Sequence, residues 1–380
     1  MKIVYCTPSL YIPGGVERVL VTKANYFAEH YGYEITIVLT DGKGKPSFYP
    51  LSDKINVINL DINFEELWSL SFTKKIPIYL KKQRTYKKAL TKLLMQIRPD
   101  FTVSLLRREI NFLCDIKDGS KKIAEMHVNR SNCRNFKEHE SNIFKDIFSR
   151  FWIHILIRNL RKLDKFVVLT KEDKESWTEL NNVINIPNPM PKMPTVFSTT
   201  QNKNAIAVGR YVYEKGFDLL LRAWAIVAKR HPDWHLDIYG GGERTEYEEM
   251  IKTIGISNNC TANGPESDIY SKYAENSIFV LSSRFEGFGM AILEAMSCGV
   301  PVVSFACPCG PSEIIDDGMD GFLARNGDIK DLAEKICKVI ENDELRSEMG
   351  KRGIKSAEKY KIECIATRWK KLFESLASHA

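Results

Sequence analysis

The chain has 380 residues, 44% of them hydrophobic and 27% charged, which describes a globular protein long enough for two domains. Nine scattered cysteines without a C-x-x-C pair argue against a disulfide framework or a zinc site and favour a reduced, cytoplasmic protein. No run approaches the roughly 18–20 apolar residues of a membrane helix, and the amino terminus lacks the flanks of a signal peptide. We therefore expect any membrane contact to be peripheral, on the inner face of the cell membrane.

The first half alternates short apolar runs with helical patterns. Such alternation predicts a parallel sheet with helices on both faces. The predicted strands cover residues 2–6, 34–39, 55–60, 101–105, 122–126 and 165–169, and the clearest helices cover 16–30 and 86–97.

The amino-acid composition changes near 187–203, where four prolines are followed by Ser, Thr, Gln and Asn. This composition predicts a linker. The alternation then restarts. Strands are expected at 205–208, 235–239, 278–281 and 300–305, and helices at 217–229, 291–298, 329–341, 344–359 and 362–376. We therefore expect α/β domains at 1–188 and 204–361, a linker at 189–203 and a terminal helix within 362–380. Two doubly wound domains facing across a cleft would bind a ligand at the carboxyl ends of their strands.

Charge is unevenly distributed between the halves. Residues 1–202 hold 32 Lys and Arg against 21 Asp and Glu, a net charge of +11, whereas residues 203–380 hold 23 against 27, a net charge of −4. Two basic stretches, from Lys74 to Lys92 and from Phe148 to Leu163, mix cations with apolar residues, as on an anionic membrane surface. Nucleic acid, or an amphipathic helix packed on its own domain, would explain the same pattern. Pro77 predicts that the first stretch is not one unbroken helix.

Three glycine-containing loops each join a strand to a helix. Gly14 and Gly15 open the first long helix, whose free N–H groups can attract phosphate, although a simple turn explains the pair at least equally well. Arg210 and Lys215 lie in a Gly-Arg-x4-Lys-Gly loop and could neutralise a diphosphate, the alternative being ordinary surface charge. The run from Gly240 to Gly242 is interpreted as a permissive turn lining the same cleft.

The most informative segment spans 282–303 and carries Glu286 and Glu294 eight residues apart. Glu286 lies in a loop that opens a helix, and Glu294 lies about two turns further on. The residues between Glu286 and the helix start are Gly287, Phe288, Gly289 and Met290. Phosphate held by backbone N–H groups, with carboxylates reaching hydroxyls, is the pattern of a nucleotide-sugar site. A purely structural pair favoured by the helix dipole is the alternative.

His127 follows the predicted strand 122–126, so it should lie at the carboxyl edge of the sheet. There it can donate to a sugar hydroxyl or to developing charge, and a buried histidine with satisfied hydrogen bonds is the equal alternative. The sequence contains no D-x-D, Walker A, H-E-x-x-H or G-x-S-x-G motif. A metal held by carboxylates therefore has no obvious ligands.

In this order, the motifs resemble the retaining glycosyltransferases of family 4, which have the GT-B fold, over nearly the whole chain. The resemblance is most specific in Gly209-Arg210-x4-Lys215-Gly216, Glu286-x7-Glu294 and Pro311-Ser-Glu-Ile-Ile-x3-Gly318-x2-Gly321-Phe-Leu. It implies metal-independent transfer, with retention, of a hexose or N-acetylhexosamine from a nucleotide sugar, with UDP the favoured carrier. The implied acceptor is a lipid-linked or glycan chain of bacterial capsule, O-antigen or exopolysaccharide synthesis. The Cys307-Pro-Cys309 turn departs from the usual family pattern and is expected to shape the sugar pocket.

The resemblance also implies roles for single residues. Arg210 and Lys215 would hold the donor diphosphate, and Glu294 would bind the ribose hydroxyls. Glu286 and His127 are the catalytic candidates beside the donor sugar. The backbone groups expected around the donor belong to Gly14, Gly15, Gly287, Phe288, Gly289 and Met290. The first domain would bind the acceptor, and the terminal helix would cross back onto it.

Two other functions fit parts of the pattern. A UDP-sugar 2-epimerase has the same fold, and a basic nucleic-acid-binding protein would explain the charge asymmetry, although no groove-reading element is visible.

Overall fold

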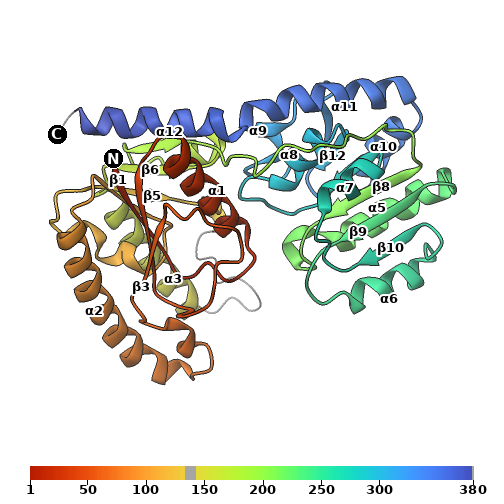
Figure 1. Cartoon of the computed structure of the whole chain (residues 1–380). Helices are drawn as coiled ribbons and strands as arrows, with labels where there is room; N and C mark the ends of the chain where they lie inside the picture. The colour runs from red at the N-terminus through yellow and green to blue at the C-terminus, as the bar shows by residue number, and fades with distance from the viewer. Residues whose placement is uncertain (133–142, 379–380) are drawn as a thin grey trace. The chain divides into compact units, whose positions relative to one another are not determined.

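A computed structural model describes residues 1–132 and 143–378, apart from the side chains of 72–73, 132 and 143–151. The chain divides into two units, Met1–Pro191 with Ile362–Ala380, and Lys192–Lys361. The first division falls inside the range expected as a linker, and most of that range belongs to the second unit. The terminal helix belongs to the first unit, so the chain returns to it after completing the second (Figure 1).

The first unit is built on a seven-stranded parallel sheet in the order β3-β2-β1-β4-β5-β6-β7. Its strands are β1 Lys2–Thr7, β2 Glu34–Leu39, β3 Asn56–Asn59, β4 Phe101–Ser104, β5 Lys121–Glu125, β6 Lys165–Val168 and β7 Val183–Asn185. All of β4 and all but the first residue of β1 are buried, as expected for central parallel strands. The strand order reverses between β1 and β4, and doubly wound sheets bind ligands beyond the carboxyl ends of the strands at such a switch point.

The helices of this unit are α1 Gly15–His30, α2 Phe72–Ile97, α3 Ile143–Leu160, α4 Lys171–Ser176 and α12 Ile362–Ala377. The predicted return of the terminal helix is confirmed, because α12 packs beside α1 (Figure 1). The Phe373 ring lies 6.0 Å from that of Phe27 on α1 and 4.7 Å from that of Phe101 on β4. These aromatic contacts fasten the last segment of the chain to the core of its first unit.

Helix α2 corrects the prediction that Pro77 breaks the basic stretch. The helix runs unbroken from Phe72 to Ile97 with Pro77 inside it. Pro77 lies in the second turn and is exposed, so only one intrahelical hydrogen bond is lost and water can solvate the freed carbonyl. The apolar side of the helix is held by buried Tyr86, Leu90 and Leu94, spaced four residues apart.

The second basic stretch is packed mainly on its own unit. The side chains of its first four residues, 148–151, lie outside the described ones. Further along, Leu156, Leu160 and Leu163 are buried in the core around β6, while Arg158 and Arg161 are exposed. This arrangement matches the alternative of an amphipathic helix packed on its own domain.

The second unit repeats the design with a six-stranded parallel sheet in the order β10-β9-β8-β11-β12-β13. Its strands are β8 Asn204–Val208, β9 His235–Tyr239, β10 Cys260–Asn263, β11 Ile278–Leu281, β12 Val302–Phe305 and β13 Gly321–Ala324. Its helices are α5 Phe217–Arg230, α6 Thr245–Ile254, α7 Ile269–Glu275, α8 Met290–Ser297, α9 Pro311–Ile314, α10 Ile329–Ile340 and α11 Asp343–Ala357. The switch point lies between β8 and β11. The expectation of two doubly wound α/β units is therefore confirmed.

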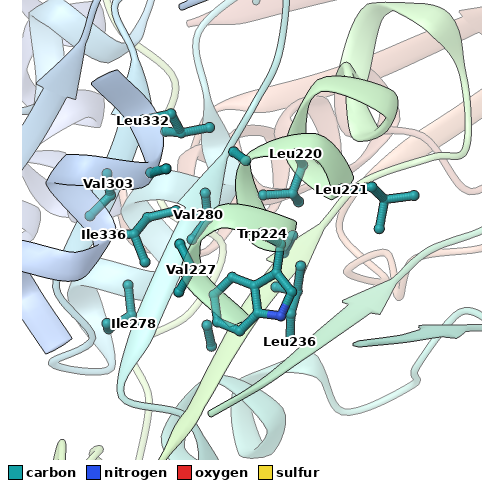
Figure 2. Packing of buried hydrophobic residues seen from close by; sticks show 14 of the residues in the cluster. Leu220, Leu221, Trp224, Val227, Leu236, Ile278, Val280, Val303, Leu332 and Ile336 are labelled. Carbon is teal, nitrogen blue, oxygen red and sulfur yellow. The ribbon is translucent and has the colours of Figure 1, made fainter. Parts of the chain in front are cut away.

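The core of the second unit lies between its sheet and the helices α5 and α10. Leu220, Leu221, Trp224 and Val227 on α5 recur at helical spacing and are buried, as Figure 2 shows. The buried Trp224 indole donates to the Asn259 carbonyl at 2.7 Å, so its one polar atom is satisfied. This packing fixes β8 and β11, whose carboxyl ends carry the candidate site.

Candidate active site

An ion pair joins two loops at the switch point of the second unit. The Lys215 ammonium, after β8, lies 2.7 Å from Glu286 Oε1, after β11. The same carboxylate oxygen accepts a hydrogen bond from the Ser283 hydroxyl at 2.6 Å. The two charged side chains are only 23% and 10% exposed, so the pair is stronger than a surface salt bridge would be. Two residues that the sequence placed 71 positions apart thus form one group.

Glycines allow these loops to approach each other. Gly216 has φ +61°, and a Cβ there would lie 2.2 Å from the Ser282 carbonyl oxygen. The Ser282 hydroxyl in turn donates to the Lys215 carbonyl at 2.9 Å. A Cβ at Gly240 would lie 1.7 Å from the Gly209 carbonyl oxygen, so the glycine run after β9 makes a close approach to the β8 loop.

The two predicted phosphate cations differ in their surroundings. Arg210 is exposed, and among the described residues its guanidinium makes no hydrogen bond or ion pair. Lys215 is committed to Glu286. Arg284, which the sequence reading did not single out, is locked by Asp218 through two hydrogen bonds of 2.9 and 2.8 Å and lies 4.0 Å above the Tyr213 ring. Arg284 therefore supports the loops, and Arg210 is the cation available to a ligand.

Helix α8 begins directly after the glutamate loop. Gly289 is its N-cap with φ +95°, and the partly exposed Gly287 and Met290 flank the helix start. Phe288 is buried and packs against Tyr360 with ring centroids 5.7 Å apart. Glu294 is only 4% exposed, and the Tyr273 hydroxyl donates to its Oε2 at 3.4 Å.

The Cys-Pro-Cys turn lies against the glutamate loop. Cys307 and Cys309 are buried, and burial raises the pKa of the Cys307 thiol. The Glu286 N–H points at the Pro308 carbonyl at 3.4 Å. Next to the turn, a Cβ at Gly310 would lie 2.4 Å from the Phe288 carbonyl oxygen, so this turn sets the position of the backbone around Glu286.

The remaining predicted site residues lie in the first unit. Gly14 is the N-cap of α1 and Gly15 its first residue, with nothing within 4 Å of a Cβ placed on Gly15. The His127 side chain is 6% exposed, with Nε2 3.5 Å from Glu125 Oε2. The Glu125 carboxylate is thus the polar neighbour of the His127 ring, and neither ring nitrogen makes a hydrogen bond of good geometry to a described residue.

A buried charge pair lies behind His127 and escaped the sequence reading. The Lys23 ammonium on α1 donates to Glu125 at the end of β5, and both are almost completely buried. The Lys23 ammonium also lies 4.4 Å above the Trp369 ring of α12. Burial alone would raise the pKa of Glu125, but Lys23 and then His127 outweigh it and hold that pKa below its ordinary value. The sequence did contain one sign of this pair, because Lys23 lies among the apolar positions of helix α1.

Within the described residues, a single group combines side chains that could hold a metal ion, His231, Cys337 and Glu341. The Arg230 guanidinium lies 2.8 Å from the same Glu341 oxygen that contacts His231. A cation already occupies that carboxylate, so the group is an ion-pair network. Within 1–132 and 143–378, no helix has the length and apolarity required to cross a bilayer.

Two doubly wound parallel-sheet units, with glycine-containing loops and an ion pair at a switch point, place the chain in the GT-B fold class. A solved structure of TarM from S. aureus, with fondaparinux, alpha-GlcNAc-glycerol and UDP, shares this fold with a TM-score of 0.75, 18% identity and coverage of 98% of this chain and 99% of that one. Residues 194–356 match the model of the family described as glycosyl transferases group 1. An uncharacterized glycosyltransferase of Haemophilus influenzae is 30% identical over 371 residues, 94% of this chain and 95% of that protein. The chain therefore belongs to the group 1 glycosyltransferases.

A second relative is the amylovoran biosynthesis glycosyltransferase AmsD of Erwinia amylovora, which is 31% identical over 54% of this chain and 61% of its own length. Family membership does not favour the epimerase alternative, and it supports a transferase over a nucleic-acid-binding protein.

Proposed function

We propose that this protein is a retaining glycosyltransferase that moves a hexose or N-acetylhexosamine from a UDP-sugar to a lipid-linked or glycan acceptor in bacterial surface polysaccharide synthesis. The observation that carries the proposal is the Lys215–Glu286 pair at the β8–β11 switch point, beside the exposed Arg210. A cation held by a carboxylate at this edge of a doubly wound sheet suits a ligand with both phosphates and hydroxyls.

The donor diphosphate would take Arg210 first, because no described residue pairs with that guanidinium, and would share the Lys215 ammonium with Glu286. The released Glu286 carboxylate could then accept a hydroxyl of the donor sugar. Backbone N–H groups at the start of α8 would bind phosphate oxygens, and Glu294 would bind the ribose hydroxyls. Cations around the leaving diphosphate stabilise the charge that develops there, which is the main catalytic contribution in this scheme.

Retention, UDP and metal independence are parts of the same proposal. A UDP-sugar of the common series carries the sugar in α-linkage, so an α-linked product corresponds to retention. The ligands bound in the TarM structure, alpha-GlcNAc-glycerol and UDP, support this combination. The absence of D-x-D from the sequence supports phosphate neutralisation by Arg210 and Lys215 in place of a carboxylate-held metal. His127 is proposed to act beside the sugar, in the environment set by Glu125.

The donor site is tested by measuring UDP affinity and UDP-sugar turnover in Lys215→Met and Glu294→Gln. We expect Lys215→Met to lower turnover by about 10²-fold or more, because one stabilising cation is lost at the leaving group. Exposed residues of the same unit provide matched controls, Lys229→Met and Glu249→Gln, which should behave as wild type. Wild-type UDP affinity in both site variants would show that the donor site lies elsewhere. NMR of the product's anomeric proton tests retention, and unchanged turnover in EDTA is expected.

We further propose that the protein works at the inner face of the membrane, with helix α2 as the contact surface. Ile76, Ile78 and Leu80 are exposed on it, 48%, 36% and 50% respectively, among exposed lysines. Apolar side chains beside lysines favour binding at an anionic lipid surface.

A further inference from the structure

A pocket of 260 Å³ lies at the switch point of the first unit. It is formed by residues that follow three neighbouring strands, β1, β2 and β4, and by the turn around η1 (Phe64–Leu67). The side chains that matter for its chemistry are Glu17, Asp41, Glu65, Trp68, Arg107 and Arg108. Its volume is below the roughly 300–1,000 Å³ of pockets for drug-sized ligands, so it suits a small ligand or one residue of a larger one.

Part of the lining is a fixed framework. Asp41 accepts hydrogen bonds from the Thr40 hydroxyl at 2.7 Å and the Glu65 N–H at 3.0 Å, and lies 3.6 Å from the Arg108 guanidinium. Glu65 accepts from the Tyr11 hydroxyl at 2.5 Å, and this hydrogen bond raises the pKa of Tyr11 to about 12. These groups already have partners and give the pocket its shape.

Three other side chains are left for a ligand. Arg107 is exposed, and neither its guanidinium nor the Glu17 carboxylate makes a hydrogen bond or ion pair with another described residue. Trp68 is 66% exposed although it lines the pocket. Its indole therefore offers an accessible apolar face within the pocket, on which a ring could pack.

These three groups together select a class of ligand. A sugar ring presents a C–H face that packs on an indole and hydroxyls that both donate and accept. A carboxylate only accepts and a guanidinium only donates, so Glu17 and Arg107 together can bind a pair of adjacent hydroxyls. A phosphate fits poorly, because three carboxylates face two guanidinium groups and one of these, Arg108, already lies beside Asp41.

We propose that this pocket binds one uncharged sugar residue, stacked on Trp68 and hydrogen-bonded by Glu17 and Arg107. The inference that this residue is the end of the acceptor glycan rests on the proposed function. The acceptor would then be recognised here by a sugar and not by a phosphate group of its carrier.

The binding claim is tested without any transfer reaction. Methyl glycosides of glucose, galactose, N-acetylglucosamine and N-acetylgalactosamine are titrated into the full chain and followed by saturation-transfer NMR, with glucose 6-phosphate as the charged comparison. We expect at least one glycoside to bind, glucose 6-phosphate to bind more weakly than methyl glucoside, and Trp68→Ala, Glu17→Gln and Arg107→Met each to weaken binding tenfold or more. Matched exposed residues outside the pocket provide the controls, Phe48→Ala and Arg84→Met, which should bind as wild type.

Binding of no glycoside, equal binding by the pocket variants and the wild type, or preference for the phosphorylated sugar would each overturn the proposal. UDP affinity measured on the same samples separates the two claims. Glycoside binding that the pocket variants lose, in a protein that never binds UDP, would leave the pocket assigned and the transferase proposal rejected. UDP binding, together with glycoside binding that the pocket variants do not weaken, would reject the pocket and leave the transferase proposal standing.

Discussion

The contact between Lys215 and Glu286 changes the role that each side chain can have before a ligand binds. Read from sequence, Lys215 is a phosphate cation and Glu286 a sugar ligand, each with its own task. In the folded chain the ammonium lies 2.7 Å from the carboxylate, so neither charge is free until a ligand divides them. Donor binding would therefore exchange one ionic partner for another, which costs less than desolvating two isolated charges.

The Lys23–Glu125 pair carries a stability prediction at the residue scale. Lys23→Met leaves a buried carboxylate without its cation, and we expect this to lower the free energy of unfolding by about 3–5 kcal/mol at pH 7. The double variant Lys23→Met/Glu125→Leu removes the stranded charge and should recover much of the loss. Denaturant titrations of the wild type and of both variants measure the difference. A double variant no more stable than Lys23→Met would contradict the pairing.

The same pair predicts that the stability of the wild type and that of Lys23→Met depend differently on pH. The folded pKa of Glu125 is lowered, so its contribution is full above the unfolded carboxyl value of about 4.3 and is lost as the pH falls through the folded pKa. In Lys23→Met the carboxylate is buried without its cation, so its pKa should rise. That variant should gain stability as the pH falls from 7 toward 5, while the wild type should not. Unfolding midpoints at several pH values distinguish the two slopes.

At the scale of elements, most strands were predicted within one residue, because buried parallel strands are nearly continuous apolar runs. Three strands were missed. β7 has only three residues, and β10 and β13, Cys-Thr-Ala-Asn and Gly-Phe-Leu-Ala, contain neither Val nor Ile. Helix α2 was predicted over 86–97 and begins at Phe72. Pro77 does not break it, because proline is tolerated near the start of a helix.

Helix α2 also carries the membrane prediction. Lys81, Lys88 and Lys92 are exposed on it, and each cation near an anionic surface contributes about 1 kcal/mol. We expect Lys81→Gln/Lys88→Gln/Lys92→Gln to reduce flotation with vesicles containing anionic lipid by more than tenfold. The matched control changes Lys351, Lys355 and Lys359 of the second unit to glutamine. Equal losses in both triple variants would indicate general charge attraction and not a surface formed by α2.

For the whole molecule, the division into two units predicts that a core substitution in one unit destabilises that unit and leaves the other unchanged. Trp369 on α12 is buried in the first unit, and Trp224 on α5 is buried in the second. Trp369→Ala should cost about 3–5 kcal/mol and speed amide exchange in β1 and α1, leaving β11 unchanged. Trp224→Ala should produce the reverse pattern. Exchange measured by mass spectrometry would contradict the division if either variant accelerated both units alike.

The sequence by itself determined the two repeats of alternating strands and helices, the presence of a last helix and the positions of the glycine loops. These features are local, since periodicity and turn chemistry act over a few residues. Only the tertiary structure decided that Lys215 meets Glu286, that Lys23 meets Glu125 behind His127, and that Trp68 and Arg107 line one pocket. Such contacts join residues on separate strands and loops, and strand order places them side by side at a switch point. The spacing of residues along the chain does not predict the order of the strands in the sheet.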